Sequence, residues 1–410
     1  MSVGIEAINA YVGRACLSVE QLFRARGLDL RRLANLDMRR KSVNLPCEDA
    51  VTNAVNAAGP LIAALEETER AKIELVIVGT ESGLDFGKSI SSYVHHYLGL
   101  SRSCRSFEVK HACYGGTAAV QTAVAMISTS PVPGARALVI ATDAASVAAR
   151  NTYWEPSQGG GAVAMLIGHD AEVLAIDPGA SGFHSFEVMD TLRPRPDLEA
   201  GDSDLSLLAY LECLQHSYRA YSARVPGADL RTTFAHLAFH TPFAGMVPAA
   251  FRRLRQSAAP GGRAEIEQDF AERVAPGLSF ASEVGNFCSA SLYLALCSLV
   301  AGIEVPVPER VGLFSYGSGC ASEFYSGVVT PLGRERVRAR DIEAAISDRY
   351  PLSMAEYELL SDMSLDRMCG VRDQKFDTAA YADVWAAKFE GRELLVLDQI
   401  ADFHRQYRWS

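Results

Sequence analysis

The stretch EVKHACYGGTAA, residues 108–119, decides how the rest of the chain is interpreted. A run suited to a β-strand ends here, and Cys113 precedes glycines and small residues suited to the start of a helix. A thiol beside the first turn of a helix faces free N–H groups and the positive end of the helix dipole, which lower its pKa. Gly115 and Gly116 allow close approach of backbone and substrate. The stretch predicts a nucleophile, with a buried structural cysteine as the alternative.

Strand-like and helix-like runs alternate on both sides of Cys113. Strands are predicted within 74–83, 136–146, 159–168, 236–243 and 310–329, and helices within 113–128 and 286–302. This alternation predicts a layered α/β fold with a mixed sheet. Because the two halves have similar patterns, we expect an internal duplication, with one half at 1–168 and the other at 169–410. Residues 185–225 are predicted to be an inserted segment with acidic loops and one helix.

Bulk properties exclude several classes of protein. The chain has 410 residues, 49% of them hydrophobic, which is ample for a large core. A net charge of −10 argues against nucleic-acid binding. The nine cysteines are odd in number and scattered, as in a reduced cytoplasmic protein, and no signal peptide or membrane span is predicted. No paired metal-ligand spacing occurs in the sequence, so we expect no metal.

Other polar residues also follow predicted strands or precede predicted helices. Glu81 is a possible general base, particularly if partial burial raises its pKa, or an ordinary loop carboxylate. His240 is positioned to relay a proton or bind a substrate oxygen, or it is a structural histidine. Ser318 lies in a glycine-rich turn that suits an oxyanion hole, and Asn286 either fixes a carbonyl or caps a helix. Together with Cys113, this set suits Claisen-type acyl chemistry on thioesters.

Several motifs then occur in one order along the chain: VGTESG (78–83), EVKHACYGGTAA (108–119), EPSQGGGAVAMLIG (155–168), FHTPF (239–243), GLFSYGSG (312–319) and SEFYSG (322–327). In this order and spacing they resemble the 3-hydroxy-3-methylglutaryl-CoA synthases of the thiolase superfamily. The resemblance implies a duplicated βαβαβαββ five-layered α/β fold and a homodimer. It also implies that Cys113 is acylated, Glu81 is the general acid/base and His240 orients the acceptor. The supporting positions it implies are Asp143, Asp190, Asn286, Tyr316 and Ser318.

Three stretches resemble more closely the synthase-like enzymes of polyketide β-branching, which use acyl carrier proteins. They are residues 35–58, 151–161 and 188–213. This branch implies that Cys113 takes acetyl from a donor carrier protein and condenses it, aldol-type, onto the β-ketone of a polyketide held by an acceptor carrier protein. Hydrolysis of the Cys113 thioester then leaves a 3-hydroxy-3-carboxymethyl branch. No cofactor is expected to be permanently bound, because a phosphopantetheine arm, or CoA, delivers the acyl group.

Two clusters of basic residues suit docking of an acidic carrier protein. They comprise Arg31, Arg32, Arg39, Arg40, Lys41, Arg252, Arg253 and Arg255. Solvated helix faces are the alternative, and a CoA phosphate site would use similar residues.

Three other functions stay open at this point. One is a CoA-dependent 3-hydroxy-3-methylglutaryl-CoA synthase of isoprenoid metabolism. Another is a ketosynthase III-like condensing enzyme, which the FHTPF run and the EVGNFC loop disfavour. The third is a non-catalytic scaffold of a synthase complex, for which loss of Cys113, Glu81 or His240 would be the signature.

Overall fold

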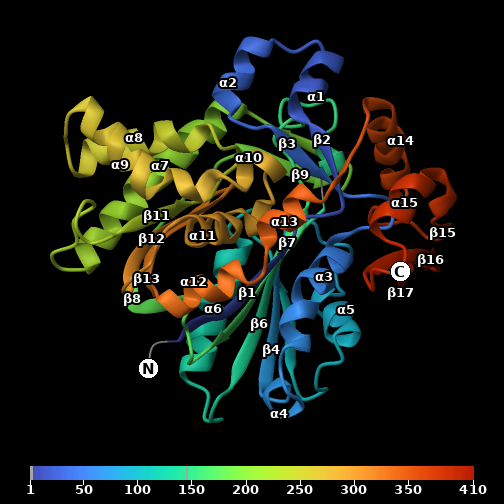
Figure 1. Ribbon diagram of the computed structural model, residues 1–410, viewed down its shortest axis with the longest axis horizontal. Helices are drawn as coiled ribbons and strands as arrows, with labels where there is room; N and C mark the ends of the chain where they lie inside the picture. The colour runs from blue at the N-terminus through green and yellow to red at the C-terminus, as the bar shows by residue number, and fades with distance from the viewer. Residues whose placement is uncertain (1–2, 145) are drawn as a thin grey trace.

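A nine-stranded mixed sheet forms the centre of the molecule (Figure 1). The computed structural model describes residues 3–144 and 146–410. The strand pairs β4–β5, β4–β6 and β11–β12 are parallel, and the other neighbours are antiparallel. In spatial order the strands are β11 (His236–Phe239), β12 (Glu309–Gly317), β13 (Ala321–Val329), β8 (Leu174–Ser185), β1 (Gly4–Tyr11), β7 (Gly161–Gly168), β6 (Arg136–Asp143), β4 (Ile73–Gly79) and β5 (Arg105–Val109).

The sheet is divided into two parts because β8 pairs with β1 only near Gly4 and Ile5, and pairs with β13 along most of its length. Helices α6 (Gly115–Ser128) and α11 (Ser291–Gly302) pack between these parts in one apolar cluster. Helix α3 (Ala50–Ala63) covers the outer face of the part containing β1, and α7 (Ser203–Arg224) covers the outer face of the part containing β8. The resulting five layers confirm the predicted α/β fold.

Helix α6 lies very close to the loop before α11 because it begins with small residues. A Cβ atom on Gly116 of α6 would lie 2.2 Å from the carbonyl oxygen of Ser289, so only glycine fits there. The predicted boundary at 168/169 falls in the connection between β7 and β8. The division into two duplicated halves stays a prediction.

The segment predicted as an insertion is more ordered than acidic loops and one helix. Strands β9 (Thr191–Arg195) and β10 (Leu198–Gly201) form a hairpin that leads directly into α7. Asp202 caps α7, because its Oδ1 accepts hydrogen bonds from the N–H groups of Asp204 at 2.9 Å and Leu205 at 3.0 Å. The sequence did not predict this hairpin, since prolines interrupt its strand pattern.

The C-terminal residues pack against the layer formed by α3. Strands β16 (Leu395–Ala401) and β17 (His404–Trp409) pair with each other, and β17 supplies two side chains to the start of α3. Arg405 Nη1 lies 3.0 Å from Asp49 Oδ2, and the Tyr407 hydroxyl donates to the same oxygen at 2.9 Å. Because Asp49 also caps α3, the last strand stabilises a helix near the beginning of the chain.

The remaining elements surround this framework, and none of the described helices is long and apolar enough to cross a membrane. The strands are β2 (Ala15–Ser18), β3 (Arg40–Val43), β14 (Tyr350–Pro351) and β15 (Gln374–Lys375). The helices are α1 (Val19–Ala25), α2 (Leu33–Leu36), α4 (Glu67–Arg70), α5 (Ile90–Tyr97), α8 (Met246–Ala258), α9 (Arg263–Arg273), α10 (Ala281–Val284), α12 (Pro331–Arg338), α13 (Ile342–Ser347), α14 (Met354–Leu365) and α15 (Ala382–Lys388).

Candidate active site

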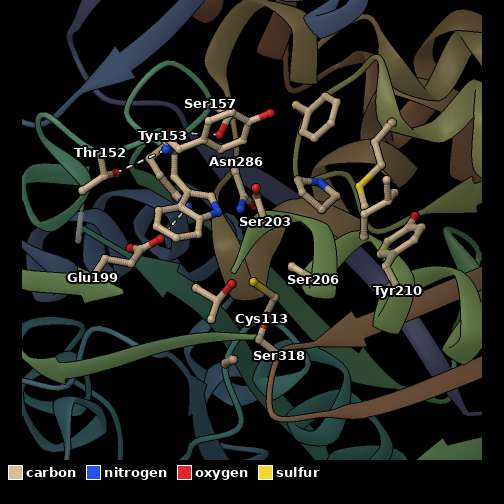
Figure 2. A pocket seen from close by; sticks show the side chains of 18 of the residues that line it. Cys113, Thr152, Tyr153, Ser157, Glu199, Ser203, Ser206, Tyr210, Asn286 and Ser318 are labelled. Carbon is tan, nitrogen blue, oxygen red and sulfur yellow. Dashed lines mark hydrogen bonds between the residues drawn. The ribbon is translucent and has the colours of Figure 1, made fainter. Parts of the chain in front are cut away.

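A cavity of about 850 Å³ brings together most of the residues predicted from the sequence (Figure 2). Its lining includes Glu81, Cys113, His240, Asn286, Tyr316 and Ser318. They come from the ends of β4, β11 and β12, from the loop after β5 and from the loop before α11. Asp143 and Asp190 are buried behind the residues that line the cavity. Asp143 accepts a hydrogen bond from Glu81, and Asp190 accepts one from Tyr316. The structure therefore places all eight predicted site residues at one cavity or directly behind it.

Cys113 and Glu81 form the reactive pair of this cavity. The Cys113 thiol donates to Glu81 Oε2 over 3.5 Å. The chain turns between β5 and α6 through Ala112, whose φ of 40° lies in the left-handed region. This turn presents Cys113 two residues before the first residue of α6. Glu81 Oε2 is therefore the carboxylate oxygen toward which the Cys113 thiol hydrogen points.

The predicted lowering of the Cys113 pKa is wrong. A hydrogen bond with Cys288 lowers the pKa of the Cys113 thiol, but burial and the negative charges of Glu81 and Asp143 outweigh it. The result is a pKa of about 12. The prediction took only the helix dipole into account. The fold also places two carboxylates beside the thiol, and their negative charges raise its pKa.

Asp143 holds the loop that carries Glu81. Its Oδ1 accepts hydrogen bonds from the Glu81 N–H at 2.9 Å, the Thr80 hydroxyl at 3.0 Å and the Ser82 hydroxyl at 2.7 Å. Its Oδ2 accepts from the Ser289 N–H at 2.9 Å. Burial and the charge of Glu81 raise the pKa of Asp143 to about 6, although these hydrogen bonds oppose the rise. Asp143 thus links β4 to the loop before α11.

Two residues of the β9–β10 hairpin complete the surroundings of Glu81, and sequence reasoning missed both. Arg193 Nη2 donates to Glu81 Oε1 and to Glu199 Oε2, each at 2.9 Å, and Arg193 Nη1 donates to the Glu81 carbonyl oxygen at 3.2 Å. Burial lowers the pKa of Arg193, but the charges of Glu81 and Glu199 outweigh it and raise the pKa above its usual range. Arg193 occupies Oε1 of Glu81 and leaves Oε2 to Cys113.

His240 lies in a buried, aromatic part of the site. Its backbone N–H donates to the Phe314 carbonyl at 2.8 Å, and the Tyr210 hydroxyl donates to the His240 backbone carbonyl at 2.8 Å. The His240 ring is centred 6.4 Å from the ring of Tyr316. Burial lowers the pKa of His240 to about 3, so the imidazole is neutral near pH 7.

The glycine-rich turn after β12 is fixed by Asp190. The Tyr316 hydroxyl donates to Asp190 Oδ2 at 2.5 Å, and the Gly319 N–H donates to Asp190 Oδ1 at 2.9 Å. A Cβ atom on Gly317 would lie 2.5 Å from the backbone nitrogen of Tyr114, so glycine is required for the turn to reach the Cys113 loop. This contact brings Ser318 beside the nucleophile, as Figure 2 shows.

Asn286 faces the cavity and also organises its own loop. Its Oδ1 accepts from the Cys288 N–H at 2.9 Å and from the Ser291 hydroxyl at 2.6 Å, so its Nδ2 is the end available to a substrate carbonyl. The same contacts hold Cys288 with a φ of 48°. Sequence reasoning assigned no role to Cys288, because it lies in an apolar run with no local signal of chemistry.

The structure corrects part of the predicted docking surface. Lys41 is fully buried and donates to the Glu155 carbonyl at 2.6 Å, and Arg255 is 1% exposed between Glu265 and Asp269. Neither side chain reaches a partner. Four exposed or half-buried members have carboxylate neighbours: Arg31 pairs with Asp29, Arg39 and Arg40 with Glu283, and Arg252 with Glu267. Arg253 is exposed.

Arg32 differs from those four residues because it lines the mouth of the cavity. Its guanidinium lies 5.3 Å from the centre of the Tyr153 ring and donates to the Tyr153 hydroxyl at 2.9 Å. Figure 2 shows Tyr153 directed toward the cavity. Docking at the exposed members of the two basic clusters stays a prediction.

The fold and a cavity lined by thiol, carboxylate and imidazole define an acyl-transferring condensing enzyme. Residues 1–172 match the model of the hydroxymethylglutaryl-coenzyme A synthase N-terminal domain, and residues 263–366 match that of the C-terminal domain. The chain belongs to the hydroxymethylglutaryl-CoA synthase family.

Two curated relatives show how the chain compares within this family. It is 50% identical over 418 residues to PksG of Bacillus subtilis (strain 168), a polyketide biosynthesis 3-hydroxy-3-methylglutaryl-ACP synthase, covering 100% of this chain and 99% of that protein. It is 32% identical over 370 residues to the hydroxymethylglutaryl-CoA synthase of Enterococcus faecalis, covering 89% of this chain and 93% of that protein.

Solved structures of related enzymes superpose closely on this chain. The curacin biosynthetic pathway HMG synthase in complex with acetyl donor-ACP superposes with a TM-score of 0.98 at 48% identity, and all of both chains is covered. PksG from Bacillus subtilis gives a TM-score of 0.96 at 51% identity, with both chains fully covered. MvaS in complex with 3-hydroxy-3-methylglutaryl coenzyme A gives 0.85 at 34% identity, covering 100% of this chain and 99% of that one.

Proposed function

We propose that this chain is a 3-hydroxy-3-methylglutaryl synthase of polyketide β-branching that takes its acetyl group from an acyl carrier protein. The observation that carries the proposal is the Cys113–Glu81 pair, 3.5 Å apart in the cavity that His240 also lines. The choice of carrier protein rests on similarity: the 50% identical relative is a polyketide 3-hydroxy-3-methylglutaryl-ACP synthase, and the curacin enzyme binds a donor-ACP.

In the first step, the acetyl group moves from the phosphopantetheine thiol to Cys113. With a pKa of about 12, the Cys113 thiol is protonated at pH 7, so Glu81 Oε2 removes its proton as the sulfur attacks the acetyl carbon. A new thioester forms at Cys113, the carrier thioester breaks, and the departing phosphopantetheine sulfur takes up the proton from Glu81. Glu81 is thereby returned to its carboxylate form.

In the second step, Glu81 removes a proton from the acetyl methyl group. The resulting enolate is held by backbone N–H groups near Cys113 and Ser318, and such a donor is typically worth about 3 to 4 kcal/mol. The enolate carbon attacks the β-ketone of the acceptor, and neutral His240 donates a hydrogen bond to the oxygen that becomes the tertiary alcohol. The alkoxide takes its proton from Glu81.

In the last step, water cleaves the Cys113 thioester, which restores the thiol and leaves a carboxymethyl group on the acceptor. Asn286 Nδ2 is positioned to bind a carbonyl of the substrate. The acceptor is carried by a second acyl carrier protein, and the enzyme works as a homodimer in the cytoplasm. Arg32, at the cavity mouth, is the basic residue best placed to meet a phosphopantetheine phosphate.

The test compares acetyl-loaded carrier protein with acetyl-CoA as donors, and intact-protein mass spectrometry follows the mass of one acetyl group. We expect fast labelling from the carrier protein, slow labelling from CoA, and no labelling of Cys113→Ala. Labelling from CoA at an equal or greater rate would instead indicate the CoA-dependent synthase, which the 32% identical relative represents. Absence of label from either donor would support a scaffold.

A further inference from the structure

A second thiol lies beside the nucleophile, and the mechanism above does not use it. The Sγ atoms of Cys113 and Cys288 and a carboxylate oxygen of Glu81 all lie within 4.8 Å of one another. Cys288 is buried, and its Sγ lies 3.6 Å from Gln158 Oε1. Asn286 holds the Cys288 backbone in its left-handed conformation, so the direction of this thiol is set by the loop.

We propose that Cys113, Cys288 and Glu81 form a chelating site for a thiophilic divalent cation such as Zn²⁺, and that binding of the ion blocks acetylation. Tetrahedral zinc binds thiolate sulfur at about 2.3 Å and carboxylate oxygen at about 2.1 Å, which separates neighbouring ligand atoms by about 3.6 to 3.8 Å. Cys113 Sγ and Glu81 Oε2 are already 3.5 Å apart. Water from the cavity takes the fourth coordination position of the ion.

The charges around the two thiols favour a cation. Three carboxylates, on Glu81, Asp143 and Glu199, lie in one hydrogen-bonded network with the single guanidinium of Arg193. Because this guanidinium occupies Glu81 Oε1, Oε2 stays available as a ligand. A divalent ion that binds the two thiolates and Glu81 compensates this excess negative charge.

The protonation states of the thiols give the proposal a measurable consequence. Both sulfurs are the donors of their hydrogen bonds, Cys113 to Glu81 Oε2 and Cys288 to Gln158 Oε1. Only thiolates bind zinc tightly, so each thiol must lose its proton when the ion binds. One ion therefore releases two protons to solvent.

The site differs from a resident cofactor site. The sequence predicted no metal because it contains no CxxC or HExxH pattern and no paired zinc-ligand spacing. The fold brings Cys288 next to Cys113, which is the thiol that takes the acetyl group in the proposed mechanism. A bound ion occupies the electron pairs with which Cys113 attacks and Glu81 accepts a proton, so binding and acetylation exclude each other. The ion is an inhibitor of the proposed enzyme.

The experiment uses the full chain, reduced and freed of metal, and titrates it with Cd²⁺. The thiolate-to-cadmium charge-transfer band reports binding, and calorimetry in buffers of different ionisation enthalpy counts released protons. We expect one ion per chain and two protons. Since even outer-shell changes cost about 10-fold to 100-fold in metal affinity, Cys288→Ser should lose at least about 100-fold. Cys104→Ser, which removes a cysteine outside the cavity, should bind as wild type does.

Two results would overturn the site: no saturable band in the wild type, or unchanged affinity in Cys288→Ser. Circular dichroism and thermal melting show whether Cys288→Ser is folded, with Cys288→Ala as the second variant. If neither folds, protection of the wild type decides, and alkylation of Cys113 by iodoacetamide at an unchanged rate in saturating Zn²⁺ rules the site out. Zn²⁺ should also protect Cys113 from iodoacetamide until a chelator is added. Because acetyl labelling is measured separately with chelator present, failure of this proposal and failure of the enzymatic one are distinguishable.

Discussion

The Cys113 thiol and the His240 imidazole lie in two different walls of the cavity, and different causes keep each of them uncharged near pH 7. In the acidic wall, formed by Glu81, Cys113 and Asp143, burial and neighbouring carboxylates raise the pKa of the thiol. In the aromatic wall, formed by His240, Tyr210 and Tyr316, burial alone lowers the pKa of the imidazole. His240 therefore supplies no imidazolium to the thiol, and in the proposed mechanism Glu81 deprotonates it.

In the proposed mechanism, this difference assigns the proton transfers to the acidic wall and the hydrogen-bond donation to the aromatic wall. Glu81 is the group on the acidic wall that can exchange protons with both the thiol and the acetyl methyl group. His240 can donate a hydrogen bond but does not become charged near pH 7. Substitutions on the two walls should therefore affect different steps.

The largest expected effect comes from Glu81→Gln. This change removes the base for both acetylation and enolisation, so each rate should fall by about 1,000-fold to 10,000-fold. Mass spectrometry gives the first rate, and exchange of the acetyl methyl protons in deuterated water gives the second. Normal acetylation with lost exchange would show that another group deprotonates Cys113, and would contradict the division between the walls.

The next effect is expected from His240→Ala. Loss of one donor to the developing alkoxide should slow condensation by about 100-fold to 1,000-fold while acetylation of Cys113 continues. His240→Gln, which keeps a donor, should recover part of the loss. Single-turnover assays of the two steps separate these outcomes, and equal damage to both would refute the proposed role of the aromatic wall.

The pH dependence of condensation tests the charge of that wall directly. Because burial lowers the pKa of His240 to about 3, the imidazole stays neutral between about pH 5 and pH 9. The wild-type condensation rate should therefore show no ionisation of His240 near the usual histidine pKa of 6.5, and an ionisation near pH 6 that persists in His240→Gln belongs to Asp143, whose pKa burial raises to about 6. An ionisation there that disappears in His240→Gln would show that the imidazole titrates normally in the working enzyme.

A smaller effect is expected when Arg193 is changed to lysine. Lysine keeps the charge but cannot bond Glu81 and Glu199 as the guanidinium does, so Glu81 loses its orientation. Misplacement of this kind can cost about 100-fold, and we expect a loss of about 10-fold to 100-fold in methyl proton exchange. Arg195→Lys in the same strand, where the side chain is exposed, is the matched control. An equal loss in both variants would point to damage to the hairpin.

The smallest effect is expected from Tyr316→Phe. This change removes one of the two hydrogen bonds that Asp190 accepts from the turn and leaves a buried carboxylate oxygen without a donor. The free energy of unfolding should fall by about 1 to 3 kcal/mol, measured by chemical denaturation. Tyr153→Phe, at the exposed mouth of the cavity, should change it by less than about 0.5 kcal/mol.

The fold was largely predictable because its signals are local. The strands that end before Glu81 and His240, the strand that ends at Asp143 and the helix after Cys113 follow from runs of apolar and small residues. Polar residues at the ends of such strands are good candidates for a site. The family resemblance then assigned their expected roles.

The parts that the sequence did not predict depend on contacts between distant segments. Arg193 lies in a segment that looked like an insertion, and only the hairpin shows that it reaches Glu81. Cys288 lies in an apolar run, and its direction depends on a backbone conformation fixed by Asn286. Lys41 is part of a basic run, but a charge pattern does not reveal that its side chain is buried.

The contacts of β17 with Asp49 also have a consequence for how the chain folds during its synthesis on the ribosome. Arg405 and Tyr407 of β17 hydrogen-bond to Asp49, which caps the start of α3. The layer that contains α3 therefore gains these contacts only when β17 has left the ribosome. Synthesis proceeds at about 5 to 20 residues per second, which leaves the earlier part of the chain incomplete for tens of seconds. Ribosome-bound chains that stop before β17 should be cleaved quickly by added protease. Equal resistance with and without β17 would show that α3 is secured earlier.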